Sequence, residues 1–145
     1  MKNILIRKLK KDDAEDICKI HTAITQKPVK DDFKRTIEEQ AQKEEDASFA
    51  AEFDGRVVGY MISYTLSSGF GISESAWIAM LGVNPKFMGQ GIGEKLAGEI
   101  FRFHKNKGIQ DIYTSVGWDS TDLLSFFKTL GFDRSNFINL HKNLE

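Results

Sequence analysis

The chain has 145 residues, of which 41% are hydrophobic, a size and composition that suit one folded domain over residues 1–145 and exclude a disordered or fibrous chain. Twenty basic and 21 acidic residues leave a net charge of -1, so we expect no nucleic acid partner and no membrane partner. The single cysteine excludes an internal disulfide, and the first apolar run, residues 4–6, is too short for a signal peptide or a membrane span. We therefore expect a cytoplasmic protein.

The first part of the chain predicts a strand followed by two helices. Residues 3–9 alternate apolar and polar side chains, as a half-buried strand does. A helix is expected from Asp12 or Asp13 to the break at Pro28. Residues 31–46 then carry a narrow apolar stripe among many charges, which is typical of a helix on the surface.

The middle of the chain predicts three strands. Asp54-Gly55 separates two β-rich runs and is a strong hairpin signal, with strands expected at residues 47–53 and 56–66. Residues 75–83 are nearly all apolar, which is typical of a strand buried on both faces.

The last part of the chain predicts two helices that alternate with two strands. A helix is expected over residues 91–106 with Gly108 as its cap, then a strand over 109–116, a helix over 119–131 and a strand over 137–144. The element order is βααβββαβαβ. We therefore expect a mixed α/β fold with one right-handed crossover through the helix at residues 91–106.

Three glycines, Gly89, Gly91 and Gly93, stand where the strand at residues 75–83 gives way to a helix. Backbone N–H groups at a helix start have no partner within the helix, and the helix dipole favours negative charge there. Glycine also removes each Cβ that would hold a phosphate away from those N–H groups. The pattern predicts an anion site, with a turn that serves only tight packing as the alternative.

Two nucleotide motifs fit these glycines poorly. A Walker A loop needs lysine and then serine or threonine after its last glycine, but Gly93 is followed by Glu94 and Lys95. A dinucleotide fingerprint needs a further glycine at position 94 or 96, where Glu94 and Leu96 stand. A nucleotide-binding domain is therefore the third-ranked hypothesis.

The residues Met88-Gly89-Gln90-Gly91-Ile92-Gly93 resemble the Q/R-x-x-G-x-G/A motif of the GNAT superfamily of N-acetyltransferases. Residues 6–20, 54–63 and 126–132 also look like the family's first strand and helix, its hairpin and its closing turn. The resemblance implies a GNAT-like three-layer sandwich whose mixed, mostly antiparallel sheet has one splayed parallel pair. Met88 stands where the family usually has arginine or glutamine, so we expect weaker or altered anion binding.

The resemblance implies acetyl-CoA as co-substrate and no metal. An oxyanion donor is expected at a backbone N–H near Leu81. The residues that match the family's coenzyme site are Met80, Leu81, Gly82, Val83, Met88, Gly89, Gln90, Gly91, Ile92, Gly93, Ser120, Leu123, Phe126 and Phe127.

The resemblance leaves the catalytic base open. The family often places a glutamate on its central strand, where this chain has Ala79 and Leu81. Glu74, acting through a water molecule, is the first candidate, and Asp119 is the second. Each of the two carboxylates has an ordinary alternative role as a solvated loop residue or a helix cap.

The catalytic acid is open as well, because Phe127 stands where the family usually has a tyrosine that donates a proton to the leaving thiolate. Tyr113 or Tyr64 is a candidate replacement. Alternatively, the thiolate leaves unassisted and takes its proton from water, since a thiol has a pKa near about 8.5.

The resemblance implies transfer of an acetyl group from acetyl-CoA to a primary amine by direct attack in a ternary complex. The acceptor is a protein N-terminus, a lysine or a small-molecule amine. The alternative is a non-catalytic acyl-CoA-binding module, because the usual base and acid are missing. A homodimer through the last strand is compatible with the sequence.

Overall fold

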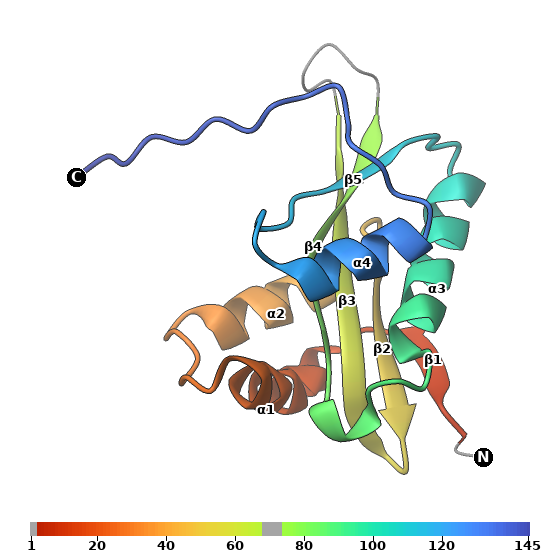
Figure 1. Cartoon of the computed structure of the whole chain (residues 1–145). Coiled ribbons are helices and arrows are strands. Elements are labelled where there is room, and N and C mark those ends of the chain that lie inside the picture. The colour runs from red at the N-terminus through yellow and green to blue at the C-terminus, as the bar shows by residue number, and fades with distance from the viewer. Residues whose placement is uncertain (1–2, 68–73) are drawn as a thin grey trace. The chain divides into compact units, whose positions relative to one another are not determined.

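One sheet of five strands organises the first part of the chain, in the spatial order β1-β2-β3-β4-β5 (Figure 1). The computed structural model describes residues 3–67 and 74–145, in two units that meet between Thr114 and Ser115. Neighbouring strands from β1 to β4 are antiparallel, and β4 and β5 are parallel. The strands are β1 (Leu5–Lys8), β2 (Ser48–Phe53), β3 (Arg56–Leu66), β4 (Ser75–Val83) and β5 (Ile112–Thr114).

Helices cover both faces of this sheet. In a strand, successive side chains point to opposite faces. Tyr60 of β3 packs with α1 and α2, whereas a Cβ built on the preceding Gly59 would meet α3. The expected three layers and mixed sheet are therefore confirmed in residues 3–114. The helices are η1 (Lys11–Asp13), α1 (Ala14–Thr25), α2 (Phe33–Ala41), η2 (Pro85–Phe87), α3 (Ile92–Asn106) and α4 (Thr121–Thr129).

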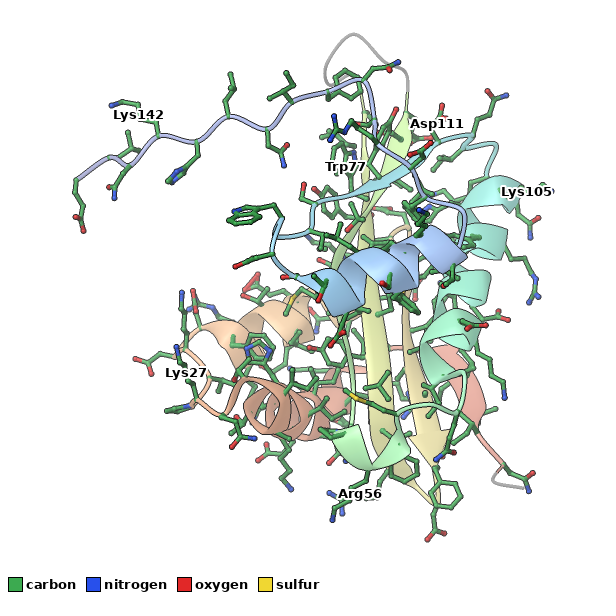
Figure 2. The ribbon with its side chains drawn as sticks, viewed as in Figure 1. Lys27, Arg56, Trp77, Lys105, Asp111 and Lys142 are labelled. Carbon is green, nitrogen blue, oxygen red and sulfur yellow. The ribbon has the colours of Figure 1, made fainter. Side chains whose placement is uncertain are left out.

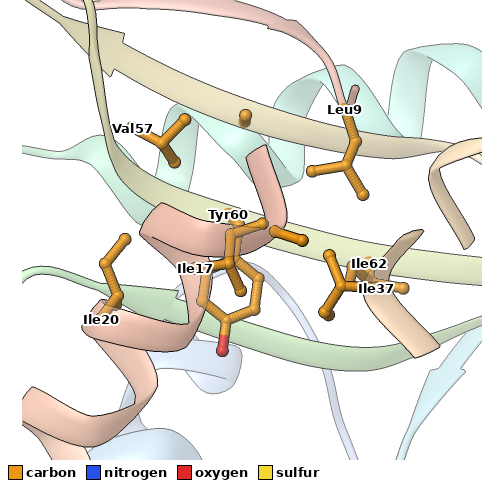
Figure 3. Close-up of a cluster of buried hydrophobic side chains, with 9 residues drawn as sticks. Leu9, Ile17, Ile20, Ile37, Val57, Tyr60 and Ile62 are labelled. Atoms are coloured by element: carbon orange, nitrogen blue, oxygen red, sulfur yellow. The ribbon is translucent and has the colours of Figure 1, made fainter. Parts of the chain in front are cut away.

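The core between the sheet and the first two helices centres on Tyr60 (Figure 3). Ile17 of α1 and Ile37 of α2 are fully buried beside it. Burial raises the pKa of Tyr60 to about 12, so its hydroxyl stays protonated at neutral pH.

Several expected boundaries are confirmed. Asp54 and Gly55 have φ values of 55° and 77°, as a type I′ hairpin turn requires. Gly108, with φ of 84°, follows the end of α3 as expected. The helix expected over residues 31–46 is shorter and ends at Ala41, where the N–H groups of Gln42 and Lys43 bond to carbonyl oxygens three residues back instead of four.

The last expected strand was wrong, and so was the final β of the predicted order. No strand is formed by residues 137–145, and β5 is the last strand of the described chain. The strand expected over 109–116 is also shorter, since only Ile112–Thr114 pairs with β4. Alternation of side chains indicates an extended backbone, but a strand also needs a hydrogen-bonding neighbour.

Residues 115–145 form the second unit. α4 ends at Thr129 and is followed by Gly131 at φ of 94°. The ring of Phe127 makes edge contacts with Phe126 and Phe132, at centroid distances of 5.2 and 5.1 Å. None of the helices in residues 3–67 and 74–145 combines the length and the hydropathy that crossing a bilayer would require.

Gly82 on β4 is required by the close approach of a core side chain. A Cβ at this position would lie 2.8 Å from the ring of Tyr60 and 3.1 Å from Ile24. We expect Gly82→Ala to lower the free energy of unfolding by about 1–3 kcal/mol through overpacking. Gly98→Ala is the control, because its Cβ would meet nothing within 4 Å and alanine favours a helix by about 1 kcal/mol. Urea unfolding checks both variants, and equal effects would contradict the packing argument.

His104 of α3 is buried as a neutral imidazole. The hydroxyl of Ser63 donates to the backbone oxygen of Ala47, so its oxygen accepts from Nε2–H of His104 at 2.9 Å. Nδ1 of His104 has no hydrogen-bond partner among the described residues. Burial, and then the charge of Lys107, lower the pKa of His104 below its usual value.

This lowered pKa predicts a loss of stability in mild acid. The unfolded histidine takes up a proton as the pH falls through about 6.5, whereas the folded one takes it up only at a lower pH because its pKa is lowered, so the free energy of unfolding falls below about pH 6.5. We expect His104→Gln to flatten the decline between pH 7.5 and 5 in chemical unfolding. Parallel curves for the two proteins would exclude His104 as the cause.

Candidate active site

The turn between β4 and α3 is fixed on both sides. The side chain of Asn84 accepts a hydrogen bond of 3.0 Å from the N–H of Lys86, and Pro85 opens the short helix η2. Gly89 and Gly91 follow with φ values of 81° and 77°, which side chains other than glycine rarely adopt. A Cβ at either glycine would meet nothing within 4 Å, so the space in front of the turn is open.

The start of α3 presents backbone donors with no side chain to cap them. Gly91 is the residue before the helix, and no side chain there accepts a hydrogen bond. The first helical hydrogen bond runs from the N–H of Lys95 to the oxygen of Gly91, which leaves the earlier N–H groups of the first turn without a helical acceptor. Gly93 is the second residue of α3, so it belongs to the helix rather than to the turn before it. This geometry suits an anionic oxygen.

A glycine in the middle of β3 brings the start of α3 against the end of β4. Gly59 pairs with Val83, the last residue of β4. A Cβ at Gly59 would lie 3.0 Å from Ile92 and 3.5 Å from Leu96, so only glycine lets the first turns of α3 approach so closely. Ile92 and Leu96 are almost completely buried, which holds the turn in place.

The second half of β4 has a backbone edge without a strand partner. Pairing with β5 covers Ala76, Trp77 and Ile78 only. The register with β3 shifts immediately afterwards, because Ile62 faces Met80 while Ser63 faces Ile78. Ala79 is therefore an extra residue in β4, and such a bulge increases the local twist. From Met80 to Val83, β4 pairs with β3 alone within the described sheet, which is the predicted splay of the parallel pair.

Positive charge stands on both sides of the glycine turn. Lys86 precedes it and Lys95 follows it, and both are exposed. Position 88 holds a methionine, which is 56% exposed and has no N–H group to donate to an anion, unlike arginine or glutamine. Anion binding here would depend on main-chain donors and the two lysines.

The predicted bases and acids are not gathered at this turn. Glu74 is exposed and precedes β4, seven residues before Leu81. At the rise of a strand, seven residues span about 23 Å. The ring of Tyr113 stacks on that of Trp77 at a centroid distance of 4.9 Å. Trp77, labelled in Figure 2, lies on β4 four residues before Leu81. Glu74 and the backbone N–H of Leu81 therefore lie toward opposite ends of β4.

The other predicted site residues belong to the unit from Ser115 onward. Asp119 is exposed, and Ser120 is the residue before α4 without making a side-chain cap. Leu123 is 37% exposed, whereas Phe127 is buried. The remaining predicted residue, Phe126, is half-buried on α4.

The described residues contain no group of three His, Cys, Asp or Glu side chains that could hold a metal. A cavity of about 350 Å³ includes Asn84, Lys86 and Phe87 in its lining. Another of about 510 Å³ lies at the opposite end of α3. Neither of these two cavities is lined by residues 88–94.

Sequence reasoning missed two residues that shape this site. Gly59 brings α3 against the sheet, and a glycine within an otherwise apolar strand pattern was the signal for such a close approach. Ala79 forms the bulge, and nothing in the sequence marks it, because a bulge depends on the register between two strands.

Comparisons with known proteins find relatives of this chain among N-acetyltransferases. The chain is 29% identical over 98 residues, 67% of its length, to an uncharacterized N-acetyltransferase of Methanocaldococcus jannaschii, and this stretch is 43% of that protein. It is 36% identical over 64 residues, 44% of its length, to N-alpha-acetyltransferase 30 of Schizosaccharomyces pombe, again 43% of that protein. The chain thus spans less than half the length of these curated relatives.

Solved structures share the fold over nearly the whole chain. An aminoglycoside N-acetyltransferase in complex with CoA matches with a TM-score of 0.83 and 20% identity, over 99% of this chain and 97% of the other. A ribosomal-protein-alanine N-acetyltransferase from Brucella melitensis matches with a TM-score of 0.78 and 15% identity, over 99% and 100%. The family model for GNAT acetyltransferases matches residues 14–132, so this chain belongs to the GNAT acetyltransferase family.

Proposed function

We propose that this protein transfers an acetyl group from acetyl-CoA to a primary amine, with residues 1–145 acting as one N-acetyltransferase domain. The observation that carries the proposal is the start of α3, where uncapped backbone donors adjoin the single-sided edge of β4. Membership of the acetyltransferase family supports the same reaction.

The coenzyme would be held mainly by main-chain atoms. The N–H groups from Gly89 to Glu94 are suited to the diphosphate, and Lys86 and Lys95 add positive charge nearby. The backbone of Met80–Val83 is suited to hydrogen bonds with the amides of the pantetheine arm. We propose that the pantetheine arm is also contacted by the side chains of Ser120, Leu123, Phe126 and Phe127.

Acetyl transfer needs a neutral amine, a polarised carbonyl and a stabilised leaving group. The amine nitrogen attacks the thioester carbon, the C–N bond forms, and the C–S bond breaks with its electron pair on sulfur. The N–H of Leu81 is the proposed donor to the carbonyl oxygen. The amine loses one proton to a base, and the thiolate gains one from water or from Tyr113.

Replacement of the candidate bases distinguishes them. Because Glu74 lies about 23 Å along β4 from Leu81, we expect Glu74→Gln to leave kcat within about threefold of the original value. If Asp119 is the base, Asp119→Asn lowers kcat by about 10²-fold or more and shifts its pH profile. Rate profiles of the two variants from pH 6 to 9 check both expectations, and a large loss in Glu74→Gln would move the acetyl group toward the start of β4.

The acceptor, the compartment and the partners are also proposals. Relatives named for aminoglycosides, for ribosomal-protein alanine and for N-alpha acetylation favour a small-molecule amine or a protein N-terminus. A lysine side chain, which is also a primary amine, is the third proposed acceptor. The balanced charge favours a protein with neither a nucleic acid nor a membrane partner, and we propose that it is cytoplasmic. We also propose a homodimer.

The second candidate function is a non-catalytic acyl-CoA-binding module. It is favoured by the separation of Glu74 from Leu81 and by Phe127, which has no proton to donate. The two functions separate when purified protein is mixed with acetyl-CoA and a panel of amines while free thiol is followed. Amine-dependent thiol release supports the transferase, whereas tight acetyl-CoA binding without release supports the binding module.

A further inference from the structure

The cavity of about 510 Å³ at the C-terminal end of α3 lies far from the glycine turn. It is lined by residues of α3, of the loop that follows this helix and of the start of β5. α3 has 15 residues, so its length separates the cavity from the turn by about 22 Å. Sites for small molecules typically have volumes of about 300–1,000 Å³. The cavity is therefore large enough for a small molecule and is separate from the proposed coenzyme site.

His104, which lines this cavity, has a buried acceptor without a donor. The residue is only 3% exposed. Its Nε2–H donates to the hydroxyl oxygen of Ser63 at 2.9 Å, because that hydroxyl itself donates to the backbone oxygen of Ala47. Nδ1 is then an acceptor, and it has no hydrogen-bond partner in the part of the chain that the structure describes. Since buried polar atoms are rarely left unpaired, this nitrogen favours an occupant that brings an N–H or O–H donor.

Two charged residues of opposite sign also line the cavity. Asp111 is exposed, and the negative end of the α3 dipole lies at the same end of the helix, so an ammonium group is favoured beside them. Lys105 is exposed as well and can pair with a carboxylate. Figure 2 labels both, with Lys105 near the end of α3 and Asp111 just before β5. The apolar part of the lining includes Ile109 and Ile112, against which an apolar side chain would be removed from water.

We propose that this cavity is a second binding site, which takes a free α-amino acid with an apolar side chain. The ammonium group of the amino acid donates to the carboxylate of Asp111 and to Nδ1 of His104. Its carboxylate pairs with Lys105, and its side chain packs on Ile109 and Ile112. A carboxylic acid without the ammonium group would leave both acceptors without a donor. An amine without the carboxylate would add its positive charge to that of Lys105, so the lining favours the zwitterion over either half.

Titration of the full chain with L-leucine, followed through the NMR shifts of its backbone amides, tests this site. Saturable shifts are expected in residues 104–112, with a Kd of about 1 mM or tighter. The two halves of the ligand, 4-methylpentanoate and 3-methylbutylamine, are each expected to bind at least about tenfold more weakly. Equal binding of the three compounds, or no saturable shift in residues 104–112, overturns the proposal. Shifts confined to Met80–Val83 also overturn it, because L-leucine would then occupy the proposed site of acetyl transfer.

Two variants assign the ends of the ligand. Asp111→Asn is expected to weaken L-leucine binding at least about tenfold, and it should fold because Asp111 is exposed. Asp12→Asn removes the same charge from an exposed position on η1 and is expected to leave the affinity unchanged. Lys105→Met is expected to weaken the binding of L-leucine but not that of 3-methylbutylamine, which has no carboxylate. Equal affinities for L-leucine in Asp111→Asn and Asp12→Asn overturn the assignment.

The proposed acetyl transfer is judged separately from this site. The rise in unfolding temperature with acetyl-CoA is measured on the same proteins in the absence of L-leucine. If no protein shows a rise, the result counts against the proposed function, and the amino-acid site is still decided by the L-leucine titrations.

Discussion

Gly91→Ala is expected to weaken acetyl-CoA binding by about 10²-fold or more. A Cβ at this position enters the open space through which an anion would approach the N–H groups of the first turn of α3. A left-handed backbone also costs alanine about 1–2 kcal/mol, so the turn is expected to shift away from its present conformation. Isothermal titration with acetyl-CoA measures the loss.

Gly108→Ala is the matched control, because it lies just beyond the opposite end of α3. Gly108 has φ of 84° and, like Gly91, nothing within 4 Å of its added Cβ. The two variants should therefore lose similar stability in thermal unfolding, while only Gly91→Ala loses the coenzyme. Equal affinities in both variants would show that the glycine turn does not bind it.

Arg7→Ala is expected to lower the free energy of unfolding by about 2–3 kcal/mol, or the midpoint by about 6–12 °C. Arg7 donates two hydrogen bonds to Asp13, of 2.8 and 2.9 Å, and a third of 2.8 Å to Glu52. The Asp13 side chain is only 7% exposed, so the variant leaves a buried carboxylate without its cation. We place the effect below that of a fully buried pair because the Arg7 side chain is 18% exposed.

Lys34→Ala provides the comparison for this ion pair. Lys34 also contacts a carboxylate, Glu15, at 2.9 Å, but both side chains are more than half exposed. Solvent screens such pairs, so no measurable change in the unfolding midpoint is expected. A similar loss in the two variants would show that burial of Asp13 does not set the cost.

Local signals in the sequence predicted most of the fold. The Asp54-Gly55 turn, the ends of α3 and the alternation of helices and strands depend on residues close together in the chain, and the structure has them as expected. The last strand was wrong because its formation depends on a neighbour, which no local pattern specifies. The glycine- and serine-rich residues 67–73 are typical of a loop, and residues 68–73 of it lie outside the described residues.

The candidate site was predictable to the extent that it depends on local backbone. The glycine turn and the start of α3 follow from residues 88–93 alone. The bulge at Ala79 and the contact of Gly59 with Ile92 depend on how distant segments pack. The long separation of Glu74 from Leu81 already followed from the expected strand at residues 75–83. It counts against Glu74 as the base only if the acetyl group is bound near Leu81, toward the end of β4. The roles of Asp119 and Tyr113 stay predictions, whereas the distance of Glu74 from Leu81 counts against Glu74 as the base.

Residue-resolved exchange of the backbone amides, with and without acetyl-CoA, tests the central claim most directly. We predict that the N–H groups of Gly89 through Glu94 become protected when the coenzyme is added, together with those of Met80–Val83. Protection confined to other parts of the chain, with these amides unchanged, would contradict the account.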